Sequence, residues 1–369
     1  MRFPEFSGEW DSFKLVELGK FIGGGTPSSS NLSFWTGSIP WISSSDIKED
    51  NINNISISRY ITEEAIEKSA TKYCPAPVIL IVSRVGVGKV ALSHTSLCTS
   101  QDFCNIIEIK CHPVFLSYNL LRTMKRKSRE VQGTSIKGIT SDELQKMRVF
   151  IPKNKDEQNK ISNLLTLLDE RIATQNKIIE DLKKLKSAIT DLLFHSIADA
   201  HTIRLGEIAH ITNGVGDVQD ANTEHQEDWY PFFDRSEELK WFPTYSFDKE
   251  AVIYAGEGQS FYPRYYNGKF ALHQRCYAIT DFASCIIPKY CYHFMNTLNS
   301  YFVRNSVGST VPSLRMDIFQ KVEIRLPPIP KQQHICKIID AFYTKLEVEQ
   351  RVISTLQELK QFLLSQMFI

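Results

Sequence analysis

The sequence predicts an α+β protein built from an internal repeat: an α+β domain and a long helix, then a second α+β domain and a second long helix. The first observation is that Gly133–Pro152 recurs as Gly308–Pro327, with identical residues at a constant offset. The second is that each copy continues into a long segment of helical periodicity. The third is that residues 26–132 and 215–307, which precede the two copies, have little in common. A duplicated frame with divergent inserts predicts one scaffold with pseudo-twofold repetition that presents two different recognition surfaces.

The repeat divides the chain into four segments. We predict a first domain at residues 1–152, a first helix at 153–198, a second domain at 199–327 and a second helix at 328–369. Pro152 and Pro327 mark the entrance to each helix, because proline can neither donate to a preceding strand nor continue a helix interior. Asp156 and Glu157 fall near the first turn, where the helix dipole favours negative charge.

The two helical segments are predicted to pair. Apolar residues dominate positions a and d of a heptad repeat that begins at Ile161, and an equivalent repeat begins at Ile335. The alternative is a helix packed on a globular domain with one solvated turn. Parallel pairing would crowd the two domains at one end, so we expect an antiparallel coiled coil. Helices of roughly 50 Å are compatible with readers of two DNA half-sites about 35 Å apart. The predicted d series is Leu164, Arg171, Ile178, Leu185 and Leu192.

The divergent segments are predicted to be strand-rich with a few helices. Short β-branched or aromatic runs bounded by Gly, Pro, Asn and Ser are typical of strands. The predicted strands are Val78–Val82, Val90–Leu92, Asn105–Ile109, Ala251–Tyr254 and Tyr277–Thr280, and the predicted helices are Glu63–Lys68, Val114–Lys127 and Lys289–Val303.

Bulk composition limits the class of protein. The net charge of +1 does not by itself indicate nucleic acid, so DNA binding would depend on local patches or on partners that supply positive charge. No apolar run approaches the ~20 residues that cross a bilayer, and the first residues lack the apolar core of a signal peptide, so we expect a cytoplasmic chain without membrane contact. The cysteine and histidine spacings do not match a zinc site, and the eight cysteines are expected to be reduced, small core residues.

In the first domain, three polar segments could contact DNA. Trp41–Asp46 supplies small hydroxyl groups, and Ser83–Lys89 is a predicted glycine-containing turn with Arg84 and Lys89 at its tip. The basic cluster Lys125–Lys127 precedes the repeated segment. An ordinary turn or a solvated helix face remains an alternative explanation for each segment. The candidates are Ser44, Ser45, Arg84, Lys89, Lys125, Arg126, Lys127 and Lys137.

In the second domain, Tyr262–Lys269 and His273–Arg275 combine aromatic side chains with Arg, Asn and Gln. Arginine pairs with guanine, and glutamine or asparagine pairs with adenine. Core tyrosines around a predicted hairpin turn at Asn267–Gly268 would explain much of this composition without a function. The candidates are Arg264, Tyr265, Tyr266, Lys269, Gln274, Arg275 and Arg315.

The sequence offers no convincing catalytic set. It has no nucleophile–base combination, no phosphate-binding loop of a motor, and no Asn/Asp-Pro-Pro-aromatic run for amino methylation. We therefore predict a binding protein that is not an enzyme and carries no catalytic metal or cofactor. The alternative to DNA recognition is a coiled-coil adaptor with two protein- or glycan-binding domains, which the near-neutral charge permits.

Four motifs recur in a fixed order along the chain: Arg2-Phe-Pro-Glu-Phe-x-Gly-x-Trp10, the Leu-x-Glu-Leu/Ile starts at Leu15 and Leu205, Gly-Thr-Ser…Pro152-x5-Gln158-x-x-Ile161, and Gly-Ser-Thr…Pro327-x4-Gln332-x-x-Ile335. Over nearly the whole chain, these motifs resemble those of a known family, the specificity (S) subunit of type I restriction-modification enzymes (HsdS). The segment Pro-Pro-Ile-Pro-Lys-Gln-Gln333 lacks the glutamate that usually precedes the glutamine in that family.

This resemblance implies a function for each segment. The two α/β domains would be target recognition domains that read the unlike halves of a bipartite, asymmetric target in double-stranded DNA. The two helices would form an antiparallel coiled coil that separates the domains and docks two methyltransferase subunits. S-adenosylmethionine would bind those subunits, ATP and Mg²⁺ would serve the motor-nuclease subunits, and this chain would perform no chemistry.

Overall fold

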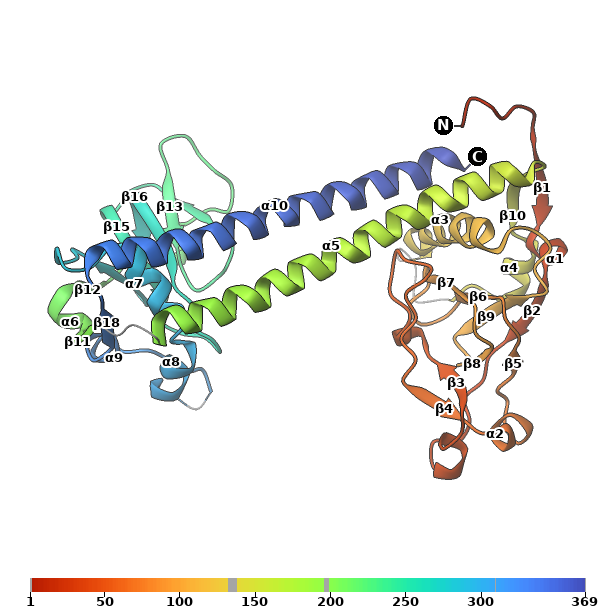
Figure 1. The fold of residues 1–369 in the computed structure, drawn as a ribbon, viewed down its shortest axis with the longest axis horizontal. Coiled ribbons are helices and arrows are strands. Elements are labelled where there is room, and N and C mark those ends of the chain that lie inside the picture. Colours follow the sequence, from red (N-terminus) through yellow and green to blue (C-terminus); the bar gives the residue numbers. More distant parts are fainter. Residues whose placement is uncertain (1, 132–137, 196–198, 309, 369) are drawn as a thin grey trace. The chain divides into compact units, whose positions relative to one another are not determined.

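The structure, a computed structural model, describes residues 2–131, 138–195, 199–308 and 310–368. Its contacts divide the chain into two compact units, Met1–Lys177 with Arg351–Ile369, and Ile178–Gln350 (Figure 1). The long helices α5 (Lys155–His195) and α10 (Ile329–Met367) therefore contribute to both units. The helical periodicity predicted from Ile161 onward is confirmed, because Ile161 lies within α5. The predicted domain boundaries remain a prediction. They treat each long helix as a separate segment, whereas the two compact units each contain parts of both helices.

The described part of the first unit contains two four-stranded sheets and a two-stranded ribbon. Within the described residues, one sheet has the order β2-β9-β6-β7 and the other β4-β3-β8-β5. The ribbon pairs β1 with β10 and leads into α5. The strands are β1 (Trp10–Lys14), β2 (Lys20–Gly23), β3 (Ile39–Ile42), β4 (Arg59–Ile61), β5 (Tyr73–Cys74), β6 (Val78–Val82), β7 (Val90–Ser93), β8 (Leu97–Thr99), β9 (Phe103–Ile107) and β10 (Arg148–Pro152).

Helix α3 covers the sheet β2-β9-β6-β7. Figure 1 shows α3 between this sheet and the long helices, and its side chains join both in one apolar core. The cap of α4 is reciprocal: Thr140 Oγ1 accepts from the Glu143 N–H, while the Glu143 carboxylate accepts from the Thr140 N–H. The helices are α1 (Leu15–Leu18), α2 (Glu63–Glu67), α3 (Pro113–Val131) and α4 (Ser141–Lys146).

The second unit repeats the ribbon but has one six-stranded sheet of order β12-β17-β15-β16-β13-β14. The helix predicted at Lys289–Val303 is interrupted, because α7 ends at Met295 and α8 starts at Asn299. The elements are β11 (His201–Arg204), α6 (Leu205–Ile208), β12 (His210–Asn213), β13 (Tyr230–Phe233), β14 (Lys240–Phe242), β15 (Phe247–Ala255), β16 (Arg264–Leu272), β17 (Cys276–Thr280), α7 (Pro288–Met295), α8 (Asn299–Asn305), α9 (Met316–Gln320) and β18 (Glu323–Leu326).

The hairpin turn predicted at Asn267–Gly268 is wrong. Both residues lie inside β16, where they pair with Glu250 and Lys249 of β15. An Asn-Gly pair forms a tight turn only where both residues leave the ladder, and here the ladder continues through them. Gly268 instead adopts a φ of +131° within the strand, a backbone conformation that favours glycine.

The buried stripe on the long helices differs from the predicted one. In the first unit, Leu165 of α5 packs with Leu363 and Leu364 of α10 in the same core. The buried face of α5 follows position a and position e, whereas Leu185 and Leu192 of the predicted d series are 49% and 63% exposed. Both stripes are rich in apolar residues, so the heptad count alone could not distinguish them.

The cysteines, possible metal-binding groups and helix hydropathy can be described for the residues that the structure covers. The eight cysteines are free thiols, and most are buried. Across residues 2–131, 138–195, 199–308 and 310–368, no three His, Cys, Asp or Glu side chains are grouped so that they could hold a metal ion. No helix in that part of the chain is long and apolar enough to cross a membrane.

Candidate nucleic-acid interface

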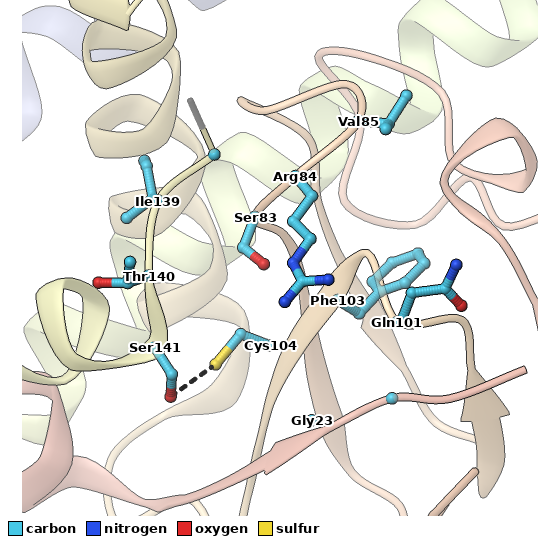
Figure 2. Close-up of a pocket in the computed structure, with 12 residues that line it drawn as sticks. Gly23, Ser83, Arg84, Val85, Gln101, Phe103, Cys104, Ile139, Thr140 and Ser141 are labelled. Atoms are coloured by element: carbon cyan, nitrogen blue, oxygen red, sulfur yellow. Dashed lines mark hydrogen bonds between the residues drawn. The ribbon is translucent and has the colours of Figure 1, made fainter. Parts of the chain in front are cut away.

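A cleft of about 700 Å³ opens in the first unit beside the ends of β2, β6 and β9. The repeated segment closes one side of this cleft, because the Ile139 N–H donates to the Ser83 carbonyl at 2.7 Å. Figure 2 shows the Arg84 side chain extending into the cleft between Ser83 and Gln101. Arg84 and Gln101 are both exposed, so the cleft presents a cation and an amide to solvent. The turn predicted between β6 and β7 is confirmed, with Arg84 near its start.

The second unit has a cleft of about 540 Å³ beside the end of β15 and the start of β17, with the loop between β13 and β14 on its other side. The repeated segment is tied to the rim of this cleft, because the Leu314 N–H donates at 2.7 Å to the carbonyl of Gly256, which lines the cleft. Arg275 pairs with Glu257 at 3.0 Å across the cleft. Burial alone would raise the pKa of the Asp234 carboxyl, but hydrogen bonds from Lys240 and Ser236 outweigh burial and hold that pKa below its usual range.

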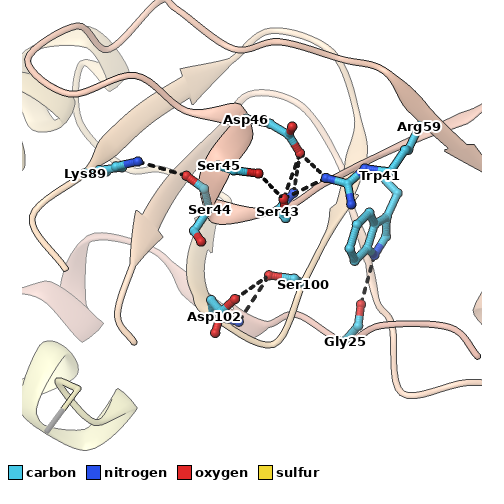
Figure 3. Close-up of polar contacts among 10 residues, drawn as sticks. All are labelled: Gly25, Trp41, Ser43, Ser44, Ser45, Asp46, Arg59, Lys89, Ser100 and Asp102. Atoms are coloured by element: carbon cyan, nitrogen blue, oxygen red, sulfur yellow. Dashed lines mark hydrogen bonds and ion pairs between the residues drawn. The ribbon is translucent and has the colours of Figure 1, made fainter. Parts of the chain in front are cut away.

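The segment Trp41–Asp46, which contains three serines, forms a tight turn with hydrogen bonds among its own residues (Figure 3). The Asp46 carboxylate accepts from the Ser43 N–H at 2.7 Å and pairs with Arg59, whose guanidinium lies 4.6 Å from the Trp41 ring centre. Of the candidates here, Ser44 uses its carbonyl to accept from Lys89 Nζ at 3.2 Å. Ser45 is exposed and its hydroxyl lies 2.9 Å from that of Ser43. Lys89, which immediately precedes β7, therefore supports this turn.

The basic candidates on α3 divide into two groups. The Lys125 ammonium pairs with the Asp50 carboxylate at 2.8 Å, so it holds the loop before β4. Arg126 is exposed and Lys127 is half-buried. Lys137 lies outside the described residues. The sequence therefore located an exposed cation on this helix but did not reveal the internal role of Lys125.

The candidates of β16 serve mostly to hold their own sheet. Arg264 donates to the Ser236 carbonyl, and the Tyr265 hydroxyl donates to the Glu250 carboxylate. Tyr266 packs against Phe233. Lys269 is exposed near the Tyr245 ring, and Arg315 is exposed at the N-cap of α9. Gln274 and Arg275 are the candidates of this unit that line the cleft.

The structure also reveals polar contacts that the sequence did not indicate. In the first unit, Glu157 is fully buried and accepts from Arg2 Nε at 2.7 Å and Trp10 Nε1 at 3.2 Å. These contacts tie the opening Arg2–Trp10 motif to the first turn of α5. Asp102, Gln101 and Glu257 also escaped notice, because sequence alone does not show which loops meet.

The glutamine repeated in both motifs, Gln158 and Gln332, has a structural role that the sequence did not indicate. Gln158 Nε2 donates to the Pro152 carbonyl at 2.8 Å, and its Oε1 accepts from the His112 N–H at 3.1 Å. In the other unit, Gln332 Nε2 donates to the Pro327 carbonyl at 2.9 Å, and its Oε1 accepts from Ile287 N–H at 2.9 Å. Each buried glutamine thus ties the start of α3 or α7 to the strand that enters a long helix.

Replacing Gln332 by alanine is expected to lower the free energy of unfolding by about 1–3 kcal/mol, because buried backbone groups lose their partners. The measurement is urea denaturation followed by circular dichroism. Gln333→Ala is the matched control, since Gln333 is exposed on the same helix and its loss should change stability by about 0.5 kcal/mol or less. Equal midpoints for the two variants would contradict the clamp.

The chain is similar in sequence and in fold to known proteins. The family model for the type I restriction modification DNA specificity domain matches residues 7–184 and 198–358. The chain is 26% identical to the MjaIX specificity subunit of Methanocaldococcus jannaschii over 96% of this chain and 92% of that protein. It is 34% identical to the EcoR124I/EcoR124II specificity subunit of Escherichia coli over 50% of this chain and 46% of that protein. The crystal structure of a type I system S subunit from M. genitalium shares the fold, with a TM-score of 0.63 at 17% identity and coverage of 100% of this chain and 99% of that chain.

Proposed function

Because the chain belongs to the type I restriction-modification DNA specificity family, we propose that its two clefts read the two halves of one gapped, asymmetric DNA target. The chain is a specificity subunit with two target recognition domains and is a non-catalytic member of its complex. The observation that carries the proposal is the pair of clefts, which share one backbone frame but present different polar side chains. Unlike side chains on a common frame favour unlike half-sites. The family match sets the adaptor alternative aside.

The proposal includes an antiparallel coiled coil of α5 and α10. Two contacts, one within each unit, support it. In the first unit, Asp169 of α5 pairs with Lys360, near the end of α10. In the second unit, Lys186, near the end of α5, lies 4.0 Å from the ring centre of Tyr343 in the first half of α10. Each contact joins an early part of one helix to a late part of the other, as opposed directions require.

We further propose that the exposed apolar stripe on α5 docks a methyltransferase subunit. Ile178, Leu185 and Leu192 recur every seven residues and are 37%, 49% and 63% exposed. A stripe of this kind on a helix fits an apolar partner surface. S-adenosylmethionine would then bind the methyltransferase subunits, and ATP and Mg²⁺ would serve the motor-nuclease subunits.

The test is methylation of a random-sequence DNA library by the chain assembled with its methyltransferase subunits. Sequencing of the methylated fragments should return one motif with two unlike halves and a fixed gap. The control is the methyltransferase subunits without this chain, which should return no such motif. A motif without a gap, or no enrichment in the full complex, would contradict the proposal.

A further inference from the structure

The two clefts stand on equivalent strands, although the inserts share little sequence. In the first unit β9 lies between β2 and β6, and in the second β17 lies between β12 and β15. All these neighbours are antiparallel. The strand ends fix the correspondence, because Val82 pairs with Phe103 in one sheet and Ala255 pairs with Cys276 in the other.

This register extends one residue into the loops on each side. Ser83 and Gly256, which follow β6 and β15, accept the same backbone hydrogen bond from the repeated segment. The loops before β9 and β17 lie beside them: the Ser83 N–H donates to the Asp102 carbonyl at 2.8 Å, and a Cβ built on Gly256 would lie 2.0 Å from the Arg275 carbonyl oxygen. Residues 84 and 102 therefore correspond to residues 257 and 275.

At these two positions the charges are reversed. The first domain carries Arg84 after β6 and Asp102 before β9, whereas the second carries Glu257 after β15 and Arg275 before β17. A glutamine precedes the second of these charged residues in both domains: Gln101 precedes Asp102, and Gln274 precedes Arg275. One cation, one carboxylate and one amide thus occupy equivalent sites, with the cation on opposite sides of the cleft.

We propose that Arg84 and Arg275 each read a guanine edge in their own half-site, and that the reversed placement contributes to the difference between the half-sites. This inference rests on the proposed function and names the residues through which it operates. Arg275 is 66% exposed while its partner Glu257 is 24% exposed. The carboxylate holds one guanidinium nitrogen from the inner side, and a guanidinium has five N–H donors, so donors remain for O6 and N7 of guanine. Glu257 is therefore a positioning residue.

The glutamines complete each reading site. Gln101 lines the first cleft beside Arg84, and its side-chain oxygen accepts from the Thr26 hydroxyl, which fixes the amide. Gln274 lines the second cleft and is exposed. Glutamine pairs with adenine through two hydrogen bonds, so each cleft carries a guanine reader and an adenine reader side by side.

The experiment measures base preference at every position of both half-sites for the assembled methyltransferase complex. Arg84→Ala should reduce discrimination at one position of one half-site by about 10–100-fold and leave the other half-site unchanged. Arg275→Ala should do the same in the opposite half-site. Lys68→Ala and Arg304→Ala remove exposed cations outside the clefts and should leave every base preference unchanged.

Two further measurements keep the outcomes distinct. Glu257→Ala should relax the same base position as Arg275→Ala by a smaller factor, and the double variant should lose no more than Arg275→Ala alone. Uniform weakening across sequences with a smaller salt dependence would identify phosphate contacts and overturn the inference. Circular dichroism checks that each variant folds, and Arg84→Lys repeats the test with charge retained but the paired donors lost. A wild-type complex without any gapped motif would instead contradict the proposed function.

Discussion

Replacing Lys360 by alanine is expected to lower the free energy of unfolding by about 3–5 kcal/mol, the largest stability effect predicted for a single side chain of this protein. Lys360 and Asp169 are each only 3% exposed in their side chains, and the ammonium bonds both the Asp169 carboxylate and the Asp50 carbonyl. The Tyr118 hydroxyl donates to the same carboxylate at 2.8 Å. Without the lysine, a buried carboxylate would lose its counter-charge. Urea denaturation followed by circular dichroism measures the change.

The internal repeat supplies a matched control. Lys186 occupies the equivalent position on α5, but it lies half-buried over the Tyr343 ring in place of a buried carboxylate. Lys186→Ala should therefore cost only about 0.5–1 kcal/mol. The double variant Asp169→Leu with Lys360→Met should recover much of the loss, because it leaves no buried charge unpaired. Equal losses for the two alanine variants would contradict a buried ion pair in the first unit.

The sequence predicted most of the frame because the frame depends on local patterns. The heptad repeat of apolar residues located both long helices, and the run Val78–Val82 matches β6 at both ends. The repeat also predicted that the two domains begin alike at Leu15 and Leu205. The structure agrees, because both leucines are fully buried. Each of these features is a property of neighbouring residues, and neighbouring residues are what a sequence displays directly.

The errors occurred where tertiary contacts decide between two local patterns. Leu185 belongs to the position d stripe, which the sequence predicted to be buried between the helices. In the structure Leu185 is exposed, and the stripe at position e is buried in its place. From its sequence context Lys360 resembles a surface residue. In the structure its ammonium is buried against Asp169, which lies on α5, far away in the sequence. Pairing of that kind cannot be read from spacing, because it depends on how the two helices meet.

The same limit applied to the candidate interface. Arg84 and Arg275 were singled out by residue type alone, whereas their equivalence follows only from the registers of two sheets. Glu257 was missed because a lone glutamate near a glycine carries no signal until its partner is known. Residue type therefore identified possible readers, and strand register identified which of them occupy corresponding sites.

Inserting seven residues into both long helices is expected to lengthen the gap between the two halves of the DNA target by about three base pairs. The insertions belong between Lys177 and Ile178 and between Gln350 and Arg351, where the contacts divide the two units, so the contacts within each unit are retained. Seven helical residues add about 10 Å, and one base pair occupies about 3.4 Å of duplex. In the proposed coiled coil, the helices set the distance between the domains.

Methylation of a library with variable gaps measures this effect directly. The bases of both half-sites should remain those of the wild type, because neither cleft is altered; a change confined to the gap therefore assigns the spacing to the helices. Lys177→Ala, which changes the same junction without changing its length, should leave the gap as it was. If the doubly extended variant folds, assembles and methylates the original gap, the helices do not act as the ruler, and the spacing must be set by the methyltransferase subunits or by bending of the DNA.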